Sequence, residues 1–248
     1  MYIFNPEHDL ALGNFSNNYT PPSSVIKMRY DMAVLPVWYT EHEAVIAEGE
    51  SNHKYIESVK ELIGISSSLI SYNDAILRSK EEIIPWGWNP AIRKTFLDKG
   101  IQENRVPPIE DLIILRNYSS RINAVKLLGE LKSECNDFYG ESHFFHDIDE
   151  LLSYLNTTPG NKVLKIPLSG SGKGLIWILG DITDKQTDWC RRVIKNQGGV
   201  IAEPVLDKVV DFAMEFFLNK GVVDFTGYSL FKSTASRAYA GNEFISDE

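Results

Sequence analysis

The sequence predicts an α/β protein of two domains, the second of them α+β. Short apolar segments alternate with amphipathic ones along residues 1–115, as in an open α/β sheet, and the later residues hold apolar segments joined by glycine-containing turns, as in antiparallel hairpins. The length of 248 residues also exceeds a typical domain of about 100–200 residues. We therefore place an N-terminal α/β domain at residues 1–115 and a second domain at residues 116–248.

In the first domain, residues 2–4 predict a strand that breaks into a loop at Asn5 and Pro6, and the apolar run 32–36 predicts a second buried strand. Apolar residues at helical spacings between residues 42 and 63, Val45 and Ile46 among them, predict one or two helices. A strand then ends near residue 85, and Pro90 opens a helix that stops before Gly100.

The second domain alternates helices and strands, with periodic apolar residues in the helices and apolar runs in the strands. We expect helices at residues 111–115, 121–131, 147–155 and 184–196, and strands at 163–166, 175–179, 200–202, 210–218 and 222–230.

Composition excludes several classes of protein. The formal charge of −9, from 34 acidic and 25 basic residues, argues against a nucleic-acid partner, because phosphate neutralisation needs a basic face. No run approaches the roughly 20 apolar residues of a membrane helix, and the first residues lack the features of a signal peptide, so we expect a cytoplasmic protein with no membrane partner. Cys135 and Cys190 fit reduced thiols. The sequence leaves room for a homodimer.

A glycine- and serine-rich segment lies between the predicted strands 163–166 and 175–179. Glycines let backbone N–H groups turn toward a phosphate, and serine hydroxyls add donors. A P-loop is excluded because Pro167 and Gly174 stand where its first glycine and its Ser or Thr are needed, and a dinucleotide fingerprint is excluded because a strand follows instead of a helix. A plain hairpin loop remains the alternative. The segment consists of Ser169, Gly170, Ser171, Gly172, Lys173 and Gly174.

Three charged residues outside this segment could bind the same ligand. Lys165 lies within an apolar strand, where its charge needs a partner, and an ATP phosphate would be one. Glu203 ends a later strand at a proline-containing hinge, and Asp211 follows. Adenine is bound by backbone groups of extended segments, and a carboxylate accepts two hydrogen bonds from ribose hydroxyls. Either acid alone is more often a solvated surface charge.

Strand lysine, glycine-rich loop, strand, helix, strand ending in Glu, hinge and acid, in this order, resemble the ATP-grasp superfamily, which includes D-alanine:D-alanine ligase, biotin carboxylase and carbamoyl-phosphate synthase. The resemblance covers roughly residues 117–241. It implies that Lys165 contacts the α and β phosphates and that residues 169–174 cover them. It also implies that Glu203, Val205 and Leu206 hold adenine, that Asp211 takes the ribose, and that Arg121 stands where the family often has a phosphate-binding lysine.

Residues 1–110 resemble, more weakly, the α/β domain that precedes ATP-grasp modules, whose first loop usually meets the acceptor substrate. Here that loop holds Glu7, His8 and Asp9. The resemblance implies that these residues bind substrate, with His8 as a base and either acid as a cation ligand. A capped turn with surface charges is the alternative.

This sequence differs from the family pattern at the magnesium ligands. ATP-grasp enzymes place an acid, a Glu and an Asn after the strand that corresponds to residues 222–230, and here only Asn242 and Glu243 are candidates, in reversed order. We therefore name no metal ligands and expect either a truncated chain or an absent metal site. His143 and His146 lack a third ligand nearby, so we do not expect a metal there.

The resemblance implies an ATP-dependent ligase with ATP and Mg²⁺ as cofactors. Such an enzyme activates a small-molecule carboxylate as an acyl-phosphate and joins it to an amine or thiol nucleophile. A nucleotide-binding module without catalysis is the alternative. A glycosyl- or nucleotidyl-transfer enzyme would share an open α/β domain, but the acidic metal motif that it needs is not found in the sequence.

Overall fold

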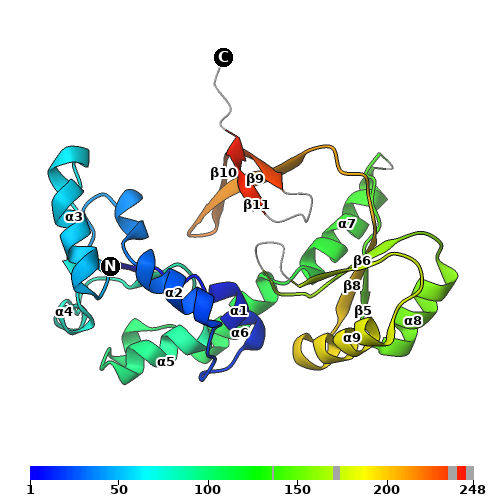
Figure 1. Cartoon of the computed structure of the whole chain (residues 1–248), viewed down its shortest axis with the longest axis horizontal. Coiled ribbons are helices and arrows are strands. Elements are labelled where there is room, and N and C mark those ends of the chain that lie inside the picture. Colours follow the sequence, from blue (N-terminus) through cyan, green and yellow to red (C-terminus); the bar gives the residue numbers. More distant parts are fainter. Residues whose placement is uncertain (136, 170–173, 234–238, 244–248) are drawn as a thin grey trace, which may run out of the picture. The chain divides into compact units, whose positions relative to one another are not determined.

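The computed structural model describes residues 1–135, 137–169, 174–233 and 239–243 (Figure 1). It divides into two compact units, Met1–Ala124 and Val125–Glu248. This division lies within helix α7 (Ile122–Glu134), whereas the domain boundary expected after residue 115 falls inside α6 (Ile109–Tyr118). Helices and strands alternate in both units, which confirms the predicted α/β class.

The first unit is built on four short strands in the order β3-β2-β1-β4, and every pair is parallel. Strand β1 lies between β2 and β4, so the order of strands reverses at β1, which is where ligands commonly bind in open α/β sheets. The remaining elements of this unit are helices (Figure 1). The bounds are β1 (Tyr2–Ile3), α1 (His8–Asn14), α2 (Ser23–Asp31), η1 (Leu35–Trp38), β2 (Val45–Ile46), α3 (Glu50–Ile63), β3 (Leu69–Ile70), α4 (Tyr72–Leu77), β4 (Ile84–Pro85), α5 (Pro90–Asp98), η2 (Glu103–Arg105) and α6.

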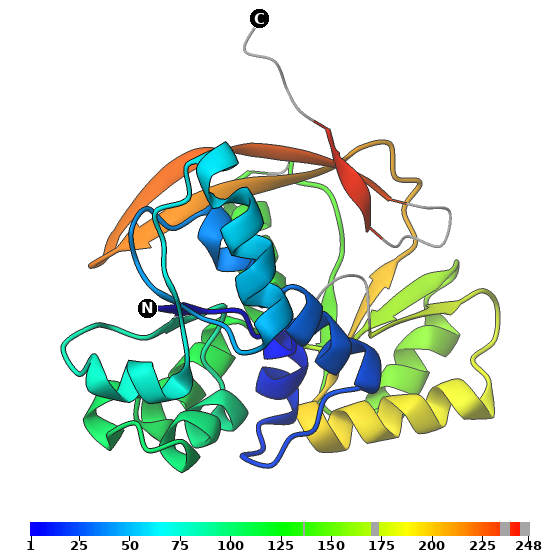
Figure 2. The ribbon, with the colours of Figure 1, turned by 60° about the vertical axis from the view of Figure 1, so that its left-hand side comes forward.

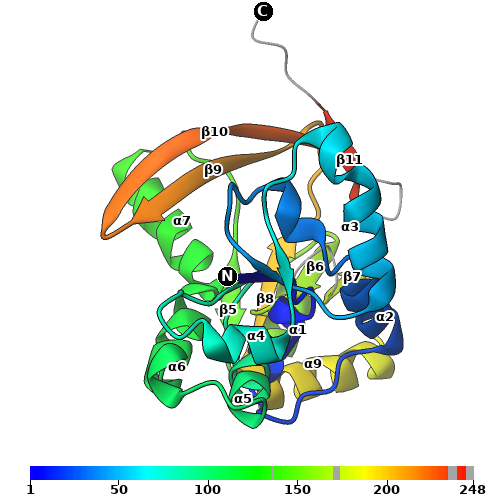
Figure 3. The same cartoon turned by 90° about the vertical axis from the view of Figure 1, so that its left-hand side faces the viewer.

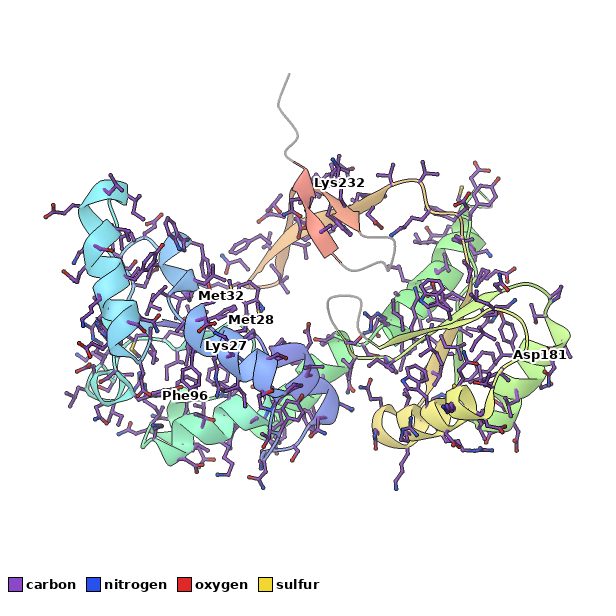
Figure 4. The ribbon with its side chains drawn as sticks, viewed as in Figure 1. Lys27, Met28, Met32, Phe96, Asp181 and Lys232 are labelled. Carbon is purple, nitrogen blue, oxygen red and sulfur yellow. The ribbon has the colours of Figure 1, made fainter. Side chains whose placement is uncertain are left out.

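Successive residues of β1 enter different cores because side chains alternate across a strand. Ile3 packs in a cluster with Ile92 and the fully buried Phe96 of α5 (Figure 4), and Tyr2 packs against a second cluster that contains Ile56 of α3. Helices therefore cover both faces of this sheet, as parallel sheets require.

Two predictions in this unit are wrong. Residues 32–36 form no strand; they turn into the short 3₁₀-helix η1, where Pro36 lacks the N–H that a strand ladder needs. The second strand in sequence is instead β2, whose two residues were expected to be helical. Periodicity does not distinguish so short an apolar pair from part of a helix. The helix opened by Pro90 is confirmed, and Asn89 Oδ1 caps it by accepting from Ile92 N at 3.0 Å.

The second unit contains a four-stranded sheet in the order β5-β8-β6-β7, in which every pair is antiparallel. Its core joins Leu164 and Ala202 of the sheet to Leu151 of α8 and to Cys190 and Val193 of α9. Helices therefore lie against one face of this sheet, which confirms the predicted α+β arrangement. The bounds are α7, β5 (His143–Phe145), α8 (Ile148–Thr157), β6 (Lys162–Lys165), β7 (Leu175–Ile178), α9 (Asp184–Gln197) and β8 (Val200–Pro204).

A separate three-stranded sheet follows, in the order β11-β10-β9, with β9 (Asp211–Asn219), β10 (Val222–Ser233) and β11 (Tyr239–Glu243). Strands β9 and β10 form a long curved ribbon (Figures 2 and 3). The predicted turn between them is confirmed: Lys220 and Gly221 have φ of 47° and 84°, the left-handed pair that a tight hairpin needs.

Helix α9 is confirmed close to its expected bounds. Gly198 ends it with φ of 85°, and Thr183 and Gln186 form a capping box at its start that we did not expect from the sequence. Among the described residues, no helix is both long and apolar enough to span a bilayer.

Two glycines of the second unit offer a test of the packing. A Cβ at Gly199 would lie 2.3 Å from Phe144 Cζ and 2.6 Å from the Phe145 carbonyl oxygen, whereas a Cβ at Gly129 of α7 meets nothing within 4 Å. Gly199→Ala should therefore lower the free energy of unfolding by about 1–3 kcal/mol. Gly129→Ala should raise it by about 0.5–1 kcal/mol, because alanine favours the helix. Thermal and urea unfolding of both variants checks this, and equal effects of the two substitutions would contradict the packing.

Candidate functional site

Lys165 and Glu203 lie on neighbouring strands and form an ion pair. Lys165 stands opposite Ile201 in the β6–β8 register, and Glu203 is two residues further along β8, so both side chains point to the same face. Lys165 Nζ is 2.5 Å from Glu203 Oε2, and Ser142 Oγ donates to Glu203 Oε1 at 3.1 Å. The strand lysine thus has a protein partner, which the sequence did not indicate.

The pair occupies the sheet face opposite α8 and α9. Leu164 and Ala202, which alternate with Lys165 and Glu203 along the strands, are fully buried in the core under those helices. The side chains of Lys165 and Glu203 keep 25% and 27% of their surface exposed, so a ligand can reach both.

A second lysine on β6 has a structural role. Lys162 is 3% exposed, and its Nζ donates to the carbonyl oxygens of Thr158, Pro159 and Gly160 at 3.3, 2.8 and 2.9 Å. The turn before β6 therefore satisfies the buried charge of Lys162 completely, and Lys165 remains the lysine of this strand that a ligand can contact.

The glycine- and serine-rich segment closes the hairpin between β6 and β7. Gly170, Ser171, Gly172 and Lys173 lie outside the described residues. At the base of the loop Ile166 N donates to the Gly174 carbonyl at 3.0 Å, and Gly174 has φ of 74°. A Cβ there would lie 2.3 Å from Ile166 Cδ1 and 3.1 Å from Ser169 Oγ. A side chain at position 174 would be strained by this backbone angle and would require the Ile166 side chain to move, so the position favours glycine.

Gln197, at the end of α9, anchors the start of this loop. Its Oε1 accepts from Leu168 N at 2.8 Å, and its Nε2 donates to the Leu168 carbonyl at 3.2 Å. One amide side chain thereby fixes both polar groups of the Leu168 backbone. Sequence reasoning missed Gln197 and Ser142, because each acts through a partner that is distant in sequence.

In the hinge after β8, one backbone hydrogen-bond donor already has a partner within the protein. Val205 N donates to the Asn161 carbonyl at 3.0 Å, so this donor is already used, while Leu206 is exposed. Further along, Lys208 Nζ lies 2.5 Å from Asp211 Oδ2 beside a cavity of about 420 Å³ that Phe231 and Lys232 also line (Figure 4 labels Lys232). Asp211 and Lys232 are thus brought to one local cavity.

Arg121 belongs to the first unit, in the turn that precedes α7, where its carbonyl accepts from Ala124 N at 3.0 Å. Its role toward a nucleotide stays a prediction.

The loop that follows β1 ends at Glu7, which is the N-cap position of α1, and His8 and Asp9 lie in the first turn of this helix. Glu7 is 6% exposed; Arg29 Nη1 contacts its Oε1 at 3.0 Å, and its Oε2 is buried with no hydrogen-bond partner among the described residues. Asp9 is exposed. Glu7 is therefore a buried, half-satisfied carboxylate and no surface charge.

Asn5 joins this segment to the end of β4. Its Nδ2 donates to the Gly87 carbonyl at 2.8 Å, and its Oδ1 accepts from Gly87 N at 3.2 Å. The His8 ring lies flat on Gly87, where a Cβ would be 2.3 Å from His8 Cγ. Burial lowers the pKa of His8, against the opposing effects of Asp9, the Gly87 carbonyl and Glu7. His8 is therefore neutral at pH 7 and can accept a proton.

A magnesium cage is not formed by the described residues, which contain no group of three or more His, Cys, Asp or Glu side chains placed to hold a metal. His143 Nε2 is 4.0 Å from Glu141, and His146 Nδ1 lies 3.1 Å from the Gly198 carbonyl. Asn242 is exposed on β11, and the side chain of Glu243 lies outside the described part. Burial raises the pKa of the Cys190 thiol to about 11, so this cysteine stays protonated.

Comparison with known proteins gives similarity to solved structures only. No protein-family model matches the sequence, and a search of curated proteins gives no match. Among solved structures the chain is similar to N5-carboxyaminoimidazole synthetase from Staphylococcus aureus, determined with ADP, at 10% identity and a TM-score of 0.44. The match covers 79% of this chain and 56% of that one, so the chain spans little more than half of its neighbour. A likeness of this size carries no function across.

The lowered pKa of His8 predicts a pH dependence of stability. Between the ordinary histidine pKa of 6.5 and the lower folded value, the unfolded chain binds more protons than the folded one. The contribution of His8 is therefore complete above pH 6.5 and is lost as the pH falls below that value. Melting temperatures at pH 7.5 and 5.5 should differ less for His8→Gln than for the wild type. His53→Gln, at an exposed histidine of α3, is the control and should leave the difference unchanged; a His8 variant with the wild-type difference would contradict the assignment.

Proposed function

We propose that the second unit binds ATP and that the chain acts as an ATP-dependent ligase of the carboxylate–amine or carboxylate–thiol type. The observation that carries the proposal is the Lys165–Glu203 pair, partly exposed on a sheet face beside the loop that begins at Ser169. The pair places the Lys165 ammonium at the base of a loop whose glycines and serines suit phosphate binding.

Glu203 has a specific consequence for phosphate binding. Without nucleotide, the carboxylate neutralises the Lys165 ammonium and limits the cost of placing it in an apolar strand. A phosphate of ATP would replace or share this partner, and a phosphate offers more acceptor oxygens than a carboxylate. The free energy that ATP binding gains here is the difference between the lysine–phosphate and the lysine–carboxylate ion pairs. It is therefore smaller than the full attraction between Lys165 and a phosphate. Ser169, with Gly170, Ser171, Gly172, Lys173 and Gly174, would supply the remaining donors.

We assign adenine to the hinge at Glu203, Val205 and Leu206. Because Val205 N already donates to Asn161, the contribution of Val205 would come from its side chain or carbonyl, and the exposed Leu206 offers apolar surface to the base. We assign the ribose to Asp211, whose carboxylate lies in the local cavity with Lys208.

In the proposed reaction a carboxylate oxygen of the substrate attacks the terminal phosphorus of ATP, and ADP leaves. The nucleophilic amine or thiol then attacks the acyl carbon, loses a proton and displaces phosphate. The protein contributes positioning and charge neutralisation. Within the second unit, Lys165 and Lys173 would bind phosphates. The roles of Arg121 toward phosphate, of Glu7 and Asp9 toward the substrate and of neutral His8 as proton acceptor rest on the family resemblance alone. Mg²⁺ would add charge neutralisation between phosphates, but the described residues provide no cage for it.

The first test removes the lysine. Lys165→Met should abolish the rise in melting temperature that ATP causes, because ligand stabilisation follows RT ln(1 + [L]/Kd) and the phosphate contact is lost. Lys195→Met, at an exposed lysine of α9, is the charge-matched control and should keep the full ATP effect. Lys162→Met should instead lower the melting temperature without ligand. Equal stabilisation of Lys165→Met and wild type by ATP would rule out the site.

The second test separates ribose from phosphate. Asp211→Ala should weaken ATP by about 1–3 kcal/mol, the usual cost of losing a charged hydrogen-bond partner, and should leave inorganic triphosphate unaffected. Asp224→Ala, at an exposed acid of β10, is the control. Calorimetry with both ligands gives the result, and equal losses for ATP and triphosphate would show that Asp211 does not bind the ribose.

A further inference from the structure

The first unit contains a cavity of about 500 Å³ that the proposed nucleotide chemistry does not use. The end of α2, the 3₁₀-helix η1 and the start of α3 form its walls. Three aromatic rings line it, those of Tyr30, Trp38 and Tyr55, each about half exposed, together with Met32 at the end of α2 (Figure 4). Large rings left this open are common where a ligand or partner binds.

A buried amide holds these walls together. Asn52 is 8% exposed, and its Nδ2 donates to the Glu48 carbonyl at 3.0 Å and to the Tyr30 carbonyl at 3.4 Å. This side chain therefore links the first turn of α3 to the last turn of α2. The positions of Tyr30 and Tyr55 on either side of it are fixed by the fold.

Among the described residues that line the cavity there are two carboxylates, Asp31 and Glu48, and no Lys, Arg or His. The Arg29 guanidinium lies 5.6 Å from the centroid of the Tyr30 ring, so Trp38 and Tyr55 are the rings that a cationic ligand would contact. Lys27 pairs with Asp31 from the outer surface of α2, whereas Glu48 makes no ion pair within the described part of the chain. The carboxyl end of α2 and the amino end of α3 both border the cavity, so their partial charges oppose each other. Glu48 also lines a neighbouring cavity with Arg29 and Lys99, and it is the carboxylate here that is left to attract a cationic ligand.

We propose that this cavity binds an organic ammonium ion, either a primary amine in its charged form or a quaternary ammonium. Aromatic faces attract cations through the ring quadrupole, most strongly at tryptophan, and a nearby carboxylate adds Coulomb attraction. The apolar surface of Met32 and the rings suits the alkyl groups of such a ligand. The proposal stands on the cavity alone and does not require that the second unit bind ATP.

The experiment measures binding to the full chain without nucleotide. Choline and butylammonium probe the quaternary and primary arms, and 3,3-dimethyl-1-butanol is the neutral isostere of choline. Ring currents should shift the ligand methyl protons upfield in NMR titrations. Choline or butylammonium should bind, and the neutral isostere should bind at least several-fold more weakly.

Variants locate the site. Trp38→Leu and Glu48→Gln should each weaken ammonium binding about two- to fivefold, as expected for cation–π and ionic contacts at partly exposed positions, whereas Trp38→Phe should keep most of it. Trp86→Leu is the matched control: Trp86 is 56% exposed against 54% for Trp38, and it does not line this cavity. Thermal melting of each variant confirms folding. Equal binding of the neutral isostere, wild-type affinity in both Trp38→Leu and Glu48→Gln, or no binding of either cation at millimolar concentration would overturn the proposal.

Discussion

The register between β6 and β8 is the constraint on which the second unit depends. It sets Leu164 opposite Ala202 under the helices and leaves Lys165 and Glu203 together on the other face. A slip of one residue would move Lys165 into the apolar core under the helices and remove Leu164 from it, so the core fixes the register strongly. The same burial that stabilises the unit thereby positions the ion pair, and fold and candidate site are not separable here.

In the first unit, the candidate substrate residues are positioned by the segments that follow β1 and β4. Asn5 is fully buried and bonds both polar groups of Gly87, so the segments that follow the two strands are tied together where the strand order reverses. Gly87 leaves room for the His8 ring, and the resulting burial keeps that ring neutral. Beside it, Glu7 holds Arg29 with one oxygen and leaves the other without a partner among the described residues. A buried acceptor of this kind is costly unless a ligand donates to it, which suits a substrate-binding role.

Within each unit, charged and amide side chains fall into two groups that differ in how far backbone groups satisfy them. Lys162 is buried with three carbonyl partners, and the buried Asn52 and Asn5 also bond backbone groups. Lys165 and Glu48 keep exposed surface, and each lies beside a feature that suits a ligand. Complete satisfaction by backbone indicates a structural role, whereas partial satisfaction next to a loop or cavity leaves interaction energy for a ligand.

The sequence by itself determined the α/β class, the hairpin around residues 169–174, the start of α5 at Pro90, and the turn at Lys220 and Gly221, because these depend on local periodicity and on backbone angles that few residues adopt. Only the tertiary structure decided that Glu203 neutralises Lys165, that Gln197 holds Leu168, and that β2 lies at residues 45–46 where a helix was expected. These contacts join residues far apart in the chain, and a two-residue strand exists only because its neighbours pair with it. No local pattern encodes such pairing, because its free energy comes from partners that the fold alone brings together.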